Sequence, residues 1–222
     1  MNRKTVTGTH KSPRPDSSTF HPDHQMLFEI AADQGGYFTT AQARQAGFSK
    51  FLLHHHVRRG RFRPAKLRRG LYRLRDFPTG LHEEFWEALV SEGPDAVLSH
   101  ESALRLHKLS NVSPHVVHLW VPYSRRPRHQ DTSKLRRTKL HNTRKWLEPD
   151  ESTLVDGLRV TTPLRTILDV AESGTSPDQV VPAIKQALER GWATPEQLKN
   201  SARARSRLVA TRADRYLQEA LE

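Results

Sequence analysis

The hydrophobic pattern of the first third of the chain predicts short helices separated by glycines and followed by a hairpin. Apolar residues between 26 and 31 recur every three to four positions, which is the spacing of an amphipathic helix. Thr39-Thr40 and Ser49 each precede such a stretch and are expected to cap a helix. The predicted elements are a helix over 21–32, an extended piece at Tyr37-Phe38, helices over 41–46 and 50–59, and a hairpin over 61–74 that turns at Arg69-Gly70.

This order of elements is that of a winged helix-turn-helix. In that fold the third helix enters the DNA major groove, and the hairpin forms a wing that lies against the backbone. The apolar residues of the third helix face inward, so Lys50, His54 and Arg58, four residues apart, form its outward stripe. Pro64 cannot donate a hydrogen bond to a sheet, so its strand is expected at an edge.

Beyond a hinge expected at 76–80, the pattern predicts a second region that mixes helices and strands. Alternating apolar residues predict a strand over 115–122, and the Asp156-Gly157 turn breaks another over 154–160. Helices are expected over 81–91 with Leu81 inward, over 99–109 after Ser99, and from the prolines at 163, 177 and 195. The predicted class is α+β: a disordered tail over 1–20, a winged helix over 21–76, a mixed α/β domain over 81–200, and a polar, frayed helical tail over 201–222.

Charge changes this picture by pointing to an anionic partner. The formal net charge is +12, and residues 1–80 carry 15 Lys and Arg against 5 Asp and Glu. Between Asp33 and Asp76 there are 11 basic residues and no acidic one. A one-sided run of this length is the electrostatic footprint of a nucleic-acid binder. The chain has no cysteine, no apolar run long enough to span a membrane and no signal-peptide pattern, so a cytoplasmic location is expected.

The residues expected to contact DNA lie on the predicted helices and wing. Arginine and lysine hydrogen-bond guanine in the major groove, a capped helix start can meet a phosphate, and wing cations contact phosphates or the minor groove. The scarcity of exposed aromatic residues in the basic segment favours duplex DNA over single-stranded RNA. The candidate residues are Thr40, Ser49, Lys50, His54, Arg58, Arg61, Arg63, Lys66, Arg68, Arg69 and Arg73.

A second basic stretch covers residues 125–145, where nine Lys and Arg accompany Asp131 alone. A basic patch on an otherwise acidic domain suits RNA, DNA or an acidic protein face, and the sequence leaves these alternatives open. The candidate residues of this patch are Arg125, Arg126, Arg128, Arg136, Arg137 and Lys139.

No catalytic, metal or cofactor site is expected. Consecutive helical residues point about 100° apart, so His54-His55-His56 cannot converge on one ion, and His56 is expected to pack in the core. Asp150-Glu151 resembles the start of a nuclease motif, but the acidic-x-Lys partner strand that would complete it is missing. Arg165 and Asp169 lie four apart and are expected to form a surface ion pair. A nuclease or other enzyme is therefore the least supported function.

The stretch over residues 35–74 reads GGYFTTAQARQAGFSKFLLHHHVRRGRFRPAKLRRGLYRL and resembles the N-terminal winged helix of the AbiEi antitoxin family. The second region is also similar to that family through LSHESALRLHKL, VHLWVP and VTTPLRTILDVAES, so the resemblance spans most of residues 22–190. It implies a repressor of its own promoter. It also implies an antitoxin that acts, without tight toxin binding and through its second domain, against a neighbouring nucleotidyltransferase toxin of the AbiEii type. The alternative is a stand-alone regulator that binds DNA or RNA and has no antitoxin activity.

Overall fold

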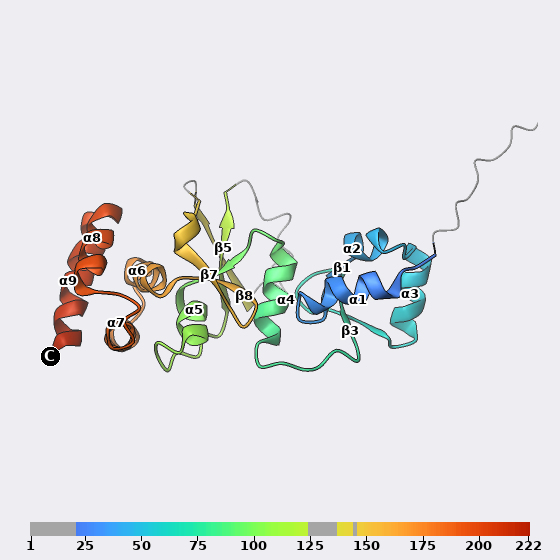
Figure 1. Cartoon of the computed structure of the whole chain (residues 1–222), viewed down its shortest axis with the longest axis horizontal. Coiled ribbons are helices and arrows are strands. Elements are labelled where there is room, and N and C mark those ends of the chain that lie inside the picture. The colour runs from blue at the N-terminus through green and yellow to red at the C-terminus, as the bar shows by residue number, and fades with distance from the viewer. Residues whose placement is uncertain (1–20, 124–136, 144–145) are drawn as a thin grey trace, which may run out of the picture.

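The computed structural model describes residues 21–123, 137–143 and 146–222. Its parts follow one another along the long axis of the molecule (Figure 1). A small helical domain with a three-stranded sheet lies at one end, a five-stranded sheet lies in the middle, and a group of helices lies at the other end. The α+β class with a winged helix first and a mixed α/β domain second is confirmed.

The N-terminal domain is a winged helix whose short elements begin where the sequence supplies a cap. Asp23, Thr39 and Ser49 accept hydrogen bonds from the first turns of their helices, and Thr39 forms a capping box with Gln42. Pro64 lies in an edge strand as expected, because the sheet order is β1-β3-β2. The elements are α1 (His24–Ala32), β1 (Tyr37–Thr39), α2 (Thr40–Gln45), α3 (Lys50–Arg58), β2 (Phe62–Pro64) and β3 (Leu71–Leu74).

The middle of the molecule is a mixed sheet in the order β6-β5-β4-β8-β7. Its β5–β6 and β4–β8 pairs are parallel, whereas β4–β5 and β7–β8 are antiparallel. The alternation of Val117, Leu119 and Val121 puts these residues in the core on one face of β5. The elements are α4 (Glu83–Glu92), β4 (Val97–Leu98), α5 (His100–His107), β5 (Val117–Pro122), β6 (Thr138–Thr143), η2 (Pro149–Glu151), β7 (Ser152–Val155) and β8 (Leu158–Thr161).

Four helices complete the chain: α6 (Pro163–Ser173), α7 (Pro177–Glu189), α8 (Pro195–Arg205) and α9 (Arg207–Leu221). The expectation of a polar, frayed tail after residue 200 is wrong, because α9 packs against α6, α7 and α8. Val209, Ala213, Tyr216 and Leu217 recur at helical spacing and are buried in the largest core cluster. No helix among the described residues is long and apolar enough to cross a membrane.

Helix α4 joins the two domains by packing on the winged-helix sheet. Val90 of α4 shares a buried cluster with Tyr37 and Leu71, and Trp86 packs against it. Gly35 has a φ of +62°, and a Cβ there would lie 2.5 Å from Trp86 Cγ, so this close approach requires glycine. Contacts between α4 and the winged helix therefore bridge residues 76–80, the segment expected to be a hinge. Leu81 is 89% exposed, contrary to the expectation that it faces inward, because α4 begins two residues later.

Candidate nucleic-acid interface

Helix α3 exposes the stripe expected to contact DNA. Ser49 caps the helix by accepting a hydrogen bond at 3.1 Å from the backbone N–H of Leu52. Lys50, His54 and Arg58 are exposed, and the opposite face packs into the core of the domain. The exposed face also carries Phe51, which is 75% exposed and which sequence reasoning did not single out. An exposed aromatic ring at the start of the helix adds apolar contact area beside the cationic stripe.

His56 packs inside the domain, as expected. Its ring stacks on Phe62 with centroids 4.8 Å apart and meets the edge of Phe48 at 5.7 Å. Burial lowers the pKa of His56 below its ordinary value, and the neighbouring His24 and Arg61 lower it further. The imidazole is therefore a neutral core group that holds α3 against β2.

The wing brings four of its candidate cations to the surface: Arg61, Arg63, Lys66 and Arg69 are exposed. Arg68 is also exposed, but its guanidinium donates to the backbone oxygen of Ser91 on α4. The wing loop is held further by Glu87, whose carboxylate accepts the N–H groups of Lys66 and Leu67 at 2.5 and 2.7 Å. The position of the wing thus depends on a helix outside the winged-helix domain.

Two further candidates have structural partners. Arg73 is buried, pairs with Glu83 at 2.9 Å and donates to the backbone oxygen of Pro78 at 2.8 Å. This side chain ties β3 to the start of α4 and is turned away from solvent, so it leaves the set of candidate DNA contacts. Thr40 donates to the backbone oxygen of Gly70 at 3.1 Å and thereby fixes the end of the wing against α2.

The second basic patch is only partly described. Arg125, Arg126, Arg128 and Arg136 lie outside the described residues. Lys139 is exposed on β6, the edge strand of the middle sheet, and Arg137 is exposed just before that strand.

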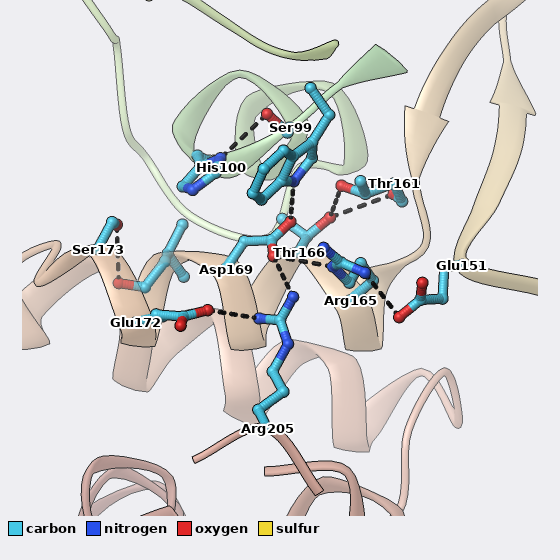
Figure 2. A network of polar contacts seen from close by, with 12 residues as sticks. Ser99, His100, Glu151, Thr161, Arg165, Thr166, Asp169, Glu172, Ser173 and Arg205 are labelled. Carbon is cyan, nitrogen blue, oxygen red and sulfur yellow. Dashed lines mark hydrogen bonds and ion pairs between the residues drawn. The ribbon is translucent and has the colours of Figure 1, made fainter. Parts of the chain in front are cut away.

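A buried ionic network lies behind the middle sheet, where a surface ion pair was expected. Asp169 on α6 is fully buried and accepts hydrogen bonds from Arg165 at 2.9 Å, Arg205 at 2.7 Å and the Trp120 indole at 2.8 Å (Figure 2). Arg165 also pairs with Glu151 at 2.7 Å. The network ties β5, α6 and α8 together by pairing buried charges of opposite sign.

Beside that network lies a group of histidines that sequence reasoning missed. One ring nitrogen from each of His100, His118 and His141 lies within 4.8 Å of the other two. Burial and the other two histidines lower the pKa of His100 to about 2, and burial followed by His118 lowers that of His141 to about 4. The histidines are 18 and 23 residues apart. The sequence gives one signal for this group: His118 and Trp120 alternate with the core residues of β5 and therefore lie together on the opposite face of that strand.

The fold is that of a two-domain protein that begins with a winged-helix module. Residues 25–75 match a family model described as a transcriptional regulator, AbiEi antitoxin, and residues 95–219 match the AbiEi antitoxin C-terminal domain. The chain belongs to the AbiEi antitoxin family, whose members are DNA-binding regulators and antitoxins. It thus has the two-domain layout that the resemblance implied.

One solved structure with a similar fold is that of the Rv2827c protein from Mycobacterium tuberculosis. It superimposes with a TM-score of 0.59 at 14% sequence identity, and the match covers 88% of this chain and 76% of that one. At this identity the likeness concerns the fold alone. No curated protein matches the chain in sequence.

Proposed function

We propose that this protein represses its own promoter by reading duplex DNA with α3 in the major groove and the wing against the backbone. The observation that carries the proposal is the exposed stripe of Lys50, His54 and Arg58 on a capped helix, next to an exposed cationic wing. Side chains on such a helix can reach base edges, whereas wing cations meet phosphates whatever the sequence.

The α3 stripe is tested by measuring binding to promoter DNA and to random duplex of equal length. Lys50→Ala or Arg58→Ala is expected to weaken promoter binding by ~1–3 kcal/mol and random binding by less. Lys185→Ala on α7 is the matched control, because it removes an equal charge from an exposed position far from α3 along the molecule. If both DNAs lose the same binding free energy, the stripe contacts phosphates alone and base reading by α3 is refuted.

The wing is tested through the salt dependence of binding. Each phosphate contact removed is expected to lower the slope of log affinity against log salt by about one unit. Arg63→Ala and Arg69→Ala remove exposed wing cations, and Lys185→Ala again serves as the control. If the salt slope is unchanged in both wing variants, the wing makes no phosphate contacts and this part of the proposal is refuted.

We further propose that the second domain neutralises a nucleotidyltransferase toxin of the AbiEii type encoded beside this gene. The match of residues 95–219 to the antitoxin C-terminal domain supports the division of labour, since the candidate DNA-reading residues lie elsewhere. Co-expression of the neighbouring toxin with the full chain should restore growth. A fragment of residues 21–93, which keeps α4 on the winged helix, should not. Rescue by that fragment would overturn the division, and no rescue by the full chain would leave a regulator without antitoxin activity.

A further inference from the structure

Three histidines from separate parts of the second domain converge at one end of the middle sheet. His118 lies on β5, His141 lies on β6, and His100 is the first residue of α5. The parallel register pairs His141 with Trp120, and residues paired across strands share a face. His118 is two residues from Trp120 and therefore points to that same face.

The backbone around His100 places its imidazole against that of His141. His100 has a φ of +49°, an uncommon conformation for a residue other than glycine. Its Nδ1 lies 3.0 Å from the Ser99 hydroxyl, and its ring stacks on His141 with centroids 3.6 Å apart. Because Ser99 is the partner of Nδ1, Nε2 is the His100 nitrogen left for a ligand.

One distance within this group suits a tetrahedral ion, and the His100 ring, which stacks on His141, has to turn for its nitrogen to reach the same ion. Two nitrogens bound to one Zn²⁺ at about 2.0–2.1 Å lie about 3.3 Å apart in tetrahedral geometry. The His141 Nε2 to His118 Nδ1 distance is 3.3 Å. Uncharged imidazoles keep a lone pair for a metal, and imidazole suits zinc and its neighbours in the first transition row.

Glu101 supplies a fourth group. Its Oε1 accepts a hydrogen bond from Thr175 at 2.6 Å, which orients the carboxylate. Its Oε2 lies 2.8 Å from His118 Nδ1, which is the distance of a hydrogen-bonded ion pair. A metal ion bound by this oxygen and this nitrogen would replace the proton that the pair shares.

We infer that His100, His118 and His141, with Glu101 beside them, form a binding site for one divalent transition-metal ion of the zinc type. The ion would join edge strand β6 to β5 and to the first turn of α5. Its role is structural, because three side chains from distant parts of the sequence would be held by one centre. The site also adjoins Trp120, whose ring centroid is 5.5 Å from those of His100 and His141.

The test uses the full chain without an affinity tag, freed of metal by a chelator and then titrated with Zn²⁺ or Co²⁺. We expect one ion per chain, a visible absorption band of tetrahedral Co²⁺, a change in tryptophan fluorescence and a Tm that rises with Zn²⁺. His141→Gln should weaken binding at least about tenfold, and Glu101→Gln by about 10- to 100-fold. The variant His55→Ala is the control, because it removes a histidine of α3 that lies outside the site and should bind Zn²⁺ as wild type does.

Two results would overturn the inference. One is a folded wild-type chain that takes up no stoichiometric Zn²⁺ or Co²⁺ at micromolar concentrations. The other is binding that stays undiminished in both His141→Gln and His118→Gln. Circular dichroism of each variant separates loss of the site from loss of the fold, and the wild-type stoichiometry decides the matter if a variant does not fold.

Discussion

Glu87 on α4 is expected to order the wing, and Glu87→Ala tests this coupling between the domains. Its Oε1 accepts the backbone N–H groups of Lys66 and Leu67 at 2.5 and 2.7 Å. Alanine leaves both N–H groups without this acceptor. The wing loop should then open to solvent more often, although the core of the winged helix and its α3 stripe keep their contacts.

The size of the effect follows from the charge and exposure of these groups. A hydrogen bond to a charged group contributes about 1.5–3 kcal/mol when it is protected from water. Lys66 is exposed and Glu87 is half-buried, so water replaces part of what is lost. We therefore expect ~1–2 kcal/mol for the two bonds together, which corresponds to a factor of about 5–30 in an opening equilibrium.

Amide hydrogen exchange in the full chain measures this opening at the two N–H groups themselves. Exchange at Lys66 and Leu67 should speed up by that factor in Glu87→Ala. It should speed up less in Glu87→Gln, which keeps an acceptor oxygen. Glu29→Ala is the control, because it removes an equal charge from an exposed site on α1, where the side chain accepts a hydrogen bond from Gln25. Wild-type exchange rates at both amides in Glu87→Ala would refute the coupling.

Three further substitutions probe the packed groups. Asp169→Asn leaves buried guanidinium groups without their countercharge, so unfolding by urea should show a loss of ~3–5 kcal/mol; a loss no larger than that of a surface variant would show that the network is dispensable. The pKa of His56 is lower in the folded state than its ordinary value of 6.5. The unfolded chain therefore binds a proton more readily, and the folded state loses stability as the pH falls below 6.5. Melting curves of His56→Leu should therefore depend less on pH below that value than those of wild type, and equal slopes would count against the assignment. Arg73→Met should lower the Tm but leave the salt slope of DNA binding unchanged. A shallower slope would show that Arg73 contacts DNA after all.

Local signals in the sequence were sufficient to predict the winged helix. Ser49 and Thr39 cap helices because their side-chain oxygens satisfy N–H groups within three residues. The edge position of Pro64 and the Asp156-Gly157 turn follow from the same short-range chemistry. Periodicity also predicted which face of α3 is buried and which face of β5 enters the core.

Side-chain roles that depend on distant partners could not be predicted in this way. Arg73 was expected at the DNA because its charge is visible in the sequence, whereas its pairing with Glu83 depends on the packing of α4 against the winged helix, which no local pattern indicates. The chain by itself determined its capped helices, its wing and its one-sided charge, since these follow from neighbours along the backbone. Only the tertiary structure decided that α4 holds the wing, that Asp169 is buried among arginines and that three separate histidines meet, because each depends on how strands and helices pack against one another.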